Sequence, residues 1–141
     1  MLVEFELMNH KARIPERRTD GASGYDIYAA EDVTIGAERF KMVGTGFRMS
    51  MSCGMEAQIR PRSGLAVNHG LTVLNAPGTI DYDYRGEIKV ILINHSPSPY
   101  KIRTGDRIAQ MVFAKVIHPA ISTGAVLDET GRGDGGFGHT G

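Results

Sequence analysis

The chain has 141 residues, enough for one domain with a real core, and its hydrophobic (41%) and charged (23%) contents are typical of a soluble globular protein. Its 16 basic and 16 acidic residues give a formal net charge of zero, which argues against a protein that coats nucleic acid or an anionic membrane. A local basic pocket for a small polyanion is compatible with this balance.

The sequence favours a cytoplasmic location. Glu4 and Glu6 do not suit a signal peptide, and no apolar run is long enough to span a bilayer. Cys53 is the only cysteine, so an intrachain disulfide is excluded. The absence of disulfides favours a reducing compartment as the protein's location. Because its neighbours supply no base or cation, we expect Cys53 to be a packed thiol rather than a nucleophile.

The hydrophobic pattern predicts a mostly β protein. Residues 3–7 and 55–60 alternate apolar and polar side chains, as half-buried strands do. A short helix is expected near 64–68, a central strand at 88–93, and a long strand at 107–117. Most of the 18 glycines and 6 prolines lie between such runs, which favours a sandwich, barrel or jelly roll. We therefore expect one all-β domain over 1–141, with a mobile C-terminal arm from about residue 124.

Two internal segments carry candidate chemistry. Arg62 and Ser63 follow a predicted strand, where the serine and the following amides could bind an anion; an ordinary helix-capping serine beside a surface arginine is the alternative. Asp81 lies in a segment with two carboxylates and two phenols, and a carboxylate near a bound phosphate can activate a water. In a straight strand Asp81 and Tyr84 would face opposite sides, so they can share a pocket only if the segment bends.

The last ten residues combine five glycines with one cation, Arg132, and one flat ring, Phe137. Such a strap could close over a ligand with an anionic end and a planar end, because arginine binds phosphate and an aromatic ring stacks on a base. A disordered, solvated terminus is the alternative. The five histidines show no metal-ligand spacing.

In combination, five segments in this order resemble the five motifs of trimeric dUTPases, over nearly the whole chain. They are residues 22–27, the block that begins at Pro61, residues 75–87, residues 105–111 and the tail from Arg132. The resemblance implies a jelly-roll fold and a homotrimer whose active sites are shared between subunits. It also implies hydrolysis of dUTP to dUMP and pyrophosphate with Mg²⁺, which limits uracil incorporation into DNA and supplies dUMP for thymidylate synthesis.

The third motif implies the catalytic and base-reading residues. Asp81 matches the carboxylate that activates the water attacking the α-phosphorus. Tyr84 matches the ring that lies against the deoxyribose and excludes a 2′-hydroxyl. Asn75 matches the reader of the uracil edge, helped by backbone groups around Gly78 and Ile80.

The remaining motifs imply the phosphate and metal contacts. Arg62, Ser63, Gly64 and Gln110 match phosphate-binding residues, and Asp26 matches a residue near the hydrated Mg²⁺, which the triphosphate mainly holds.

In the tail, Arg132 matches the γ-phosphate clamp and Phe137 the ring that stacks on uracil, with Gly138 and His139 also at the substrate. His139 departs from the family pattern, because serine usually stands there. This puts one tail–phosphate hydrogen bond in doubt and could add pH dependence, since imidazole titrates near neutrality.

Two other functions are compatible with parts of this pattern. A dCTP-deaminating enzyme of the same superfamily would carry a similar Pro-Arg-Ser block, but a different catalytic acid and no Gly-Gly-Phe-Gly tail. A binding module without catalysis would be expected to lack Asp81 or Arg132, and both are present.

Overall fold

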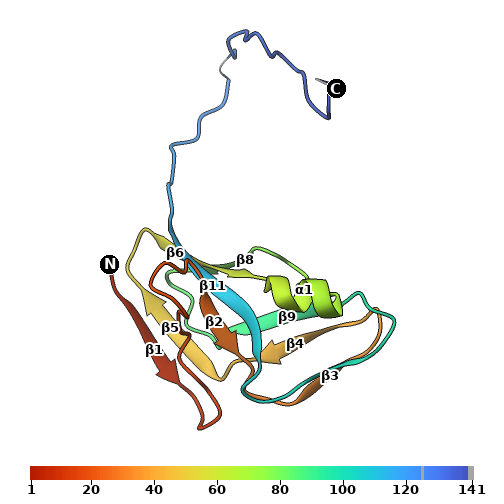
Figure 1. The fold of residues 1–141 in the computed structure, drawn as a ribbon. Coiled ribbons are helices and arrows are strands. Elements are labelled where there is room, and N and C mark those ends of the chain that lie inside the picture. The colour runs from red at the N-terminus through yellow and green to blue at the C-terminus, as the bar shows by residue number, and fades with distance from the viewer. Residues whose placement is uncertain (125, 140–141) are drawn as a thin grey trace.

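The computed structural model describes residues 1–124 and 126–139 and consists mainly of antiparallel strands (Figure 1). Within these residues there are eleven strands and one short helix. In chain order they are β1 (Val3–Leu7), β2 (Tyr25–Tyr28), β3 (Val33–Ile35), β4 (Phe40–Gly44), β5 (Phe47–Met51), β6 (Met55–Arg60), α1 (Ser63–His69), β7 (Leu71–Val73), β8 (Gly78–Asp81), β9 (Lys89–Asn94), β10 (Tyr100–Ile102) and β11 (Arg107–Lys115).

The largest sheet has the order β2-β11-β6-β8, and a second sheet has the order β4-β9-β7. Two-stranded pairs, β1 with β5 and β10 with β3, complete the β structure of the described residues. All of these pairs are antiparallel. Antiparallel strands arranged in two main sheets around one core agree with the expected jelly-roll fold.

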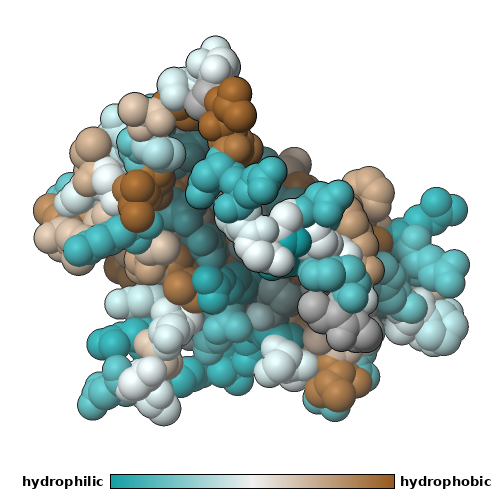
Figure 2. All heavy atoms as spheres, turned by 90° about the horizontal axis from the view of Figure 1, so that it is seen from above, coloured by the Kyte–Doolittle hydropathy of each residue, from teal (hydrophilic) through white to brown (hydrophobic). Residues whose placement is uncertain are grey.

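One hydrophobic core joins the sheets. In β6, Met55, Ala57 and Ile59 are buried while the residues between them are not, as the period of two predicts. In β9, Val90 and Leu92 are buried in the same cluster. On the face drawn in Figure 2, apolar side chains form separate groups among polar ones.

The predicted elements are confirmed with small shifts. The strand expected at 107–117 ends at Lys115, and the short helix is longer than expected, running from Ser63 to His69. Cys53 is exposed, so the expectation of a packed thiol is wrong. It lies in the turn between β5 and β6, next to Gly54 at φ +80°, where side chains point to solvent.

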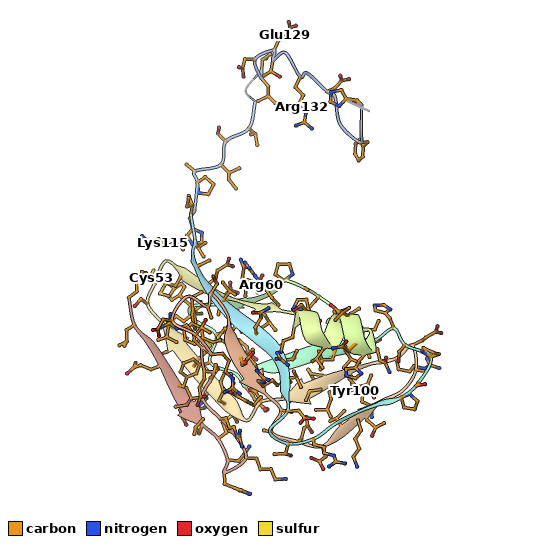
Figure 3. All side chains as sticks on the ribbon, viewed as in Figure 1. Cys53, Arg60, Tyr100, Lys115, Glu129 and Arg132 are labelled. Carbon is orange, nitrogen blue, oxygen red and sulfur yellow. The ribbon has the colours of Figure 1, made fainter. Side chains whose placement is uncertain are left out.

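After β11, the described residues of the tail form neither helix nor strand and extend away from the sheets (Figures 1 and 3). No helix in the described ranges is long and apolar enough to cross a membrane.

Candidate functional site

Three of the five sequence segments meet around one polar cavity of about 410 Å³. The loop before β2, the start of α1 and the start of β11 bring its walls together although they are far apart in the sequence. The cavity is lined by Arg18, Ala22, Ser23, Gly24, Asp26, Arg62, Ser63, Gly64, Arg107 and Gln110. Asp26, Arg62, Ser63, Gly64 and Gln110 were all predicted site residues, and the fold brings them together.

Asp26 is the anion at the centre of this cavity, and its side chain is 14% exposed. Its Oδ1 lies 3.3 Å from Nε of Arg62, and its Oδ2 accepts a 3.0 Å hydrogen bond from Nη1 of Arg107. The Nε atom of Arg18 lies 3.6 Å from the same Oδ2. Three cations against one anion leave a net charge of +2, which favours a polyanionic ligand.

Hydrogen bonds to backbone carbonyls hold the cavity's walls. Nη1 of Arg62 donates to the carbonyl of Arg107 (3.1 Å), and Nε2 of Gln110 donates to the carbonyl of Pro61 (2.9 Å). Gly24 makes room for this second bond, because a Cβ at that position would overlap Oε1 of Gln110. The segment before α1 is therefore tied to β11 from both sides.

Ser63 is the first residue of α1, and the residue at the N-cap is Arg62, with no side-chain capping bond. The alternative interpretation of Ser63 as an ordinary capping serine is therefore wrong. Among the described residues no hydrogen bond involves its hydroxyl, which lines the cavity together with Gly64. The first amides of a helix lack intrahelical partners, so this corner offers donors to an anion.

The other end of α1 is fixed by an aromatic contact. The rings of His69 and Tyr100 lie 4.8 Å apart between centroids, at 51°. Burial raises the pKa of the Tyr100 hydroxyl, the charge of Asp106 raises it further, and the nearby Arg62 opposes both. Tyr100 thus packs beside the last residue of α1.

Asp81 and Tyr84 line a second cavity of about 540 Å³. The backbone bends after β8, where the amide of Tyr84 donates to the carbonyl of Asp81 (3.2 Å). This bend confirms the condition under which both side chains could face one pocket. The other lining residues are Met42, Thr79, Ile80, Glu87, Ile88, Lys89 and Ile91.

Asn75 and Gly78 lie at the entry to this bend. The Nδ2 atom of Asn75 is 3.2 Å from the point where a Cβ on Gly78 would stand. Gly78 is buried and pairs with Ile59, while Asn75 is exposed. Because Gly78 has no side chain, the carboxamide of Asn75 can lie close to the backbone at that position.

The tail's predicted residues do not meet either cavity within this chain. Arg132, Gly138 and His139 line a separate hollow that the tail forms on itself, with Gly131 and Gly136. Nε of Arg132 donates to the carbonyl of Gly135 (2.8 Å), and the Phe137 side chain is fully exposed. Figure 3 shows Arg132 far from the sheets.

The two cavities lie at opposite edges of the largest sheet. Asp26 is on edge strand β2 and Asp81 on edge strand β8, with β11 and β6 between them. Asp26 is aligned through Gln110 with Arg60 of β6, whereas Asp81 is aligned with Glu56 of that strand. With about 4.8 Å between strands and 3.3 Å per residue, the Cα atoms of the two aspartates are roughly 20 Å apart.

Sequence reasoning missed several lining residues. Arg107 lies within a segment that the sequence singled out, and only its side chain's direction was unknown. Arg18, Met42 and Lys89 belong to none of the five segments, and no sequence pattern marks them. In the ranges 1–124 and 126–139, no three His, Cys, Asp or Glu side chains are grouped so that they could hold a metal ion.

Comparisons with known proteins agree on one family. A family model described as dUTPase matches residues 10–141. Deoxyuridine 5'-triphosphate nucleotidohydrolase of Nautilia profundicola is 50% identical over 141 residues, covering 100% of this chain and 99% of the relative. The enzyme of the same name from Helicobacter pylori (strain P12) is 48% identical, covering 100% and 97%.

Two solved structures share the fold. Staphylococcus bacteriophage 80alpha dUTPase with dUpNHpp has a TM-score of 0.92 at 24% identity, covering 99% of this chain and 98% of that one. A variant of the dUTPase from phage phi11 of S. aureus, which coordinates a structural Mg(II) ion, has a TM-score of 0.84 at 22% identity, covering 92% and 100%. Because the family model spans residues 10–141 and full-length relatives are about half identical, this chain belongs to the dUTPase family.

Proposed function

We propose that this protein hydrolyses dUTP to dUMP and pyrophosphate. The observation that carries the proposal is the cavity around Asp26, in which three separate motif segments and the loop that carries Arg18 bring together three arginines and the residue Ser63, whose hydroxyl has no hydrogen bond among the described residues. Such a set of donors suits a polyphosphate better than a neutral ligand. The names of the relatives at 48–50% identity supply the nucleotide.

Asp81 acts as the base in this proposal. Its side chain is exposed, so a water can reach it. The carboxylate accepts a proton from the water as the water attacks the α-phosphorus in line with the leaving pyrophosphate. Negative charge then develops on the pyrophosphate, where Arg62 and the tail's Arg132 stabilise it. No covalent intermediate is required.

The donor set also fits Mg²⁺ held mainly by the triphosphate. This ion is usually bound through one or two carboxylates together with substrate phosphates. The polar cavity around Asp26, called the phosphate cavity from here on, offers that one carboxylate beside the hydroxyls of Ser23 and Ser63. Asp26 would hold the ion through water. When bound, the ion would offset charge on the phosphates.

Substrate selection follows from the bend after β8. Tyr84 lines the second cavity together with Asp81, and this cavity is called the Asp81 cavity from here on. There the ring of Tyr84 would leave no room for a 2′-hydroxyl. The buried backbone at Gly78 stands where a methyl on the base would clash, and the Asn75 carboxamide can read the uracil edge. Phe137 of the tail would stack on the base, and Ile80, Gly138 and His139 would complete the contacts.

A homotrimer with shared sites resolves the distance between the cavities. A separation of roughly 20 Å exceeds the reach of one triphosphate, so a single chain cannot place Asp81 at a phosphate bound near Asp26. A neighbouring copy can supply the missing half. The exposed face of β4 supports this, because Phe40 and Met42 are 61% and 58% exposed and Met42 lines the cavity that contains Asp81. The tail, mobile in the free enzyme, would close over the site of another subunit.

Hydrolysis of dUTP would limit uracil incorporation into DNA and supply dUMP for thymidylate synthesis, in the cytoplasm. The direct test is a pyrophosphate-release assay with dUTP, dTTP, dCTP and UTP, with and without Mg²⁺. We expect efficient pyrophosphate release from dUTP and not from dTTP, dCTP or UTP. Comparable specificity constants for dUTP and UTP would contradict the role of Tyr84, and ammonia release from dCTP would identify a deaminase instead.

The shared site can be tested by mixing two inactive variants. One carries Asp81→Asn with an intact tail, and the other keeps Asp81 but ends at Gly131. After co-refolding in equal amounts, about a quarter of all sites should combine an intact Asp81 with a neighbour's intact tail. Recovery of about a quarter of the activity supports sharing, whereas no recovery in proven mixed oligomers refutes it.

A further inference from the structure

Arg18 lines the phosphate cavity although it belongs to none of the five motif segments. It stands on the loop that leads into β2, and paired backbone hydrogen bonds between Glu16 and Asp26 close the base of that loop (2.8 and 3.4 Å). Within the loop, the amide of Ala22 donates to the carbonyl of Thr19. The position of Arg18 beside Asp26 is therefore set by backbone pairing and not by its own side chain alone.

The three arginines of the cavity differ in how firmly they are held. Arg62 makes a hydrogen bond to a backbone carbonyl and an ion pair with Asp26, and its side chain is 24% exposed. Arg107 makes one hydrogen-bonded ion pair with Asp26 at 3.0 Å, and its side chain is 38% exposed. Arg18 reaches Asp26 only through Nε, at 3.6 Å, and its side chain is 59% exposed. No hydrogen bond from Arg18 to another described residue accompanies that contact. Its guanidinium thus keeps its donors for a ligand.

We propose that Arg18 is a further substrate-binding residue, which turns from Asp26 to the phosphate oxygens of bound dUTP. The inference rests on the proposed function, because it needs a polyphosphate in this cavity. Moving from one weak contact with a carboxylate to several phosphate oxygens strengthens the ion pairing of Arg18, while Arg62 and Arg107 still neutralise Asp26. Arg18 therefore contributes to binding and not to the chemical step.

Its neighbour Arg17 provides a matched control. Arg17 carries the same charge one residue away, but it lies over the ring of Tyr25 (5.7 Å to the centroid) and donates to the carbonyl of Asp20 (2.9 Å). It does not line the phosphate cavity. Removing either arginine changes the net charge of the protein equally, so a difference between the two variants reports on position.

The experiment measures the Kd of dUpNHpp and the steady-state constants for dUTP in the full-length wild type, Arg18→Gln, Arg18→Lys and Arg17→Gln. We expect Arg18→Gln to weaken dUpNHpp binding by roughly 5- to 20-fold and to raise KM with little change in kcat. Arg18→Lys should recover part of the loss, and Arg17→Gln should stay within about twofold of wild type. The loss in Arg18→Gln should shrink at high salt, because a direct ion pair is screened.

Equal Kd values for Arg18→Gln and wild type would overturn the inference, as would an equal loss in Arg17→Gln or a loss that salt does not change. A wild type that neither binds dUpNHpp nor releases pyrophosphate would instead refute the proposed function, and this inference with it. The thermal midpoint of each variant shows that the fold is kept. If Arg18→Gln does not fold, Arg18→Lys provides the test. Lysine cannot form bidentate hydrogen bonds to phosphate oxygens, so a dUpNHpp affinity and a salt dependence identical to those of the wild type would overturn the inference.

Discussion

Gly24→Ala tests whether the hydrogen bond that ties β11 to the segment before α1 organises the cavity around Asp26. The new methyl would overlap Oε1 of Gln110 and stand 3.0 Å from its Cδ and 3.2 Å from its Cβ. The amide end of Gln110 can turn away, but it then loses the 2.9 Å hydrogen bond to the carbonyl of Pro61. The contact with Cβ remains, since Cβ cannot leave β11.

The two effects set the magnitude. One net hydrogen bond contributes about 1 kcal/mol. A tight methyl contact in a packed site adds up to about 1 kcal/mol more, so the free energy of unfolding should fall by roughly 1–2 kcal/mol. Urea denaturation at one fixed protomer concentration measures this, because assembly makes apparent stability depend on concentration. The specificity constant for dUTP should also fall, because Pro61 directly precedes Arg62.

The double variant Gly24→Ala with Gln110→Ala separates this overlap from other causes. Without the amide end of Gln110, only the 3.2 Å contact with the Cβ remains, so Gly24→Ala should cost at most about 1 kcal/mol in the Gln110→Ala background. The coupling between the two positions should therefore be about 1 kcal/mol, the contribution of the lost hydrogen bond. If the losses in the free energy of unfolding of the two single variants simply add in the double variant, the methyl at position 24 does not collide with Gln110, and the explanation is wrong. A fully stable Gly24→Ala variant would refute it as well.

Three further predictions concern single groups. Asp81→Asn should keep dUpNHpp binding but lower kcat by roughly two to four decades; retention of more than about half the activity would exclude Asp81 as the base. Hydrogen bonds from the backbone and hydroxyl of Thr104 lower the pKa of Asp32, so its stabilising effect is present above the ordinary carboxyl pKa and is lost as pH falls through the lowered value. Asp32→Asn should thus lower the thermal midpoint at neutral pH but not in acid, and equal losses at both would contradict this. If the His139 side chain contacts phosphate, His139→Ser should change the Kd of dUpNHpp measured at one fixed pH. Identical Kd values would place His139 in solvent.

The hydrophobic pattern predicted strands β6 and β9 well, because the alternation or continuity of apolar residues within a short segment largely determines whether it forms a strand. The alternation in residues 55–60 gives β6, and the apolar run at 88–93, which follows Gly86, gives β9, the middle strand of its sheet. Cys53 was misjudged because composition alone does not say that a residue stands at the tip of a turn. The turn required Gly54 at φ +80°, which sequence allows but does not demand.

The site was predictable only where a motif carried it. Asp26 and Arg107 are 81 positions apart, and their 3.0 Å hydrogen bond depends on the pairing of β2 with β11. No local rule gives such a contact. Arg18 shows the same limit more strongly, because loop geometry alone turns its side chain toward Asp26 while Arg17 turns toward Tyr25.

The balanced composition also conceals how charge is distributed. A net charge of zero excluded a broad basic surface, yet one cavity collects three arginines around one aspartate. Asp26 makes that concentration possible, because without a central anion the three guanidiniums would repel one another in a partly buried space. The same carboxylate offsets one of the three positive charges and leaves the cavity with a net positive charge, which suits a polyanion. Asp26 therefore lets three arginines share one partly buried cavity in a protein of zero net charge.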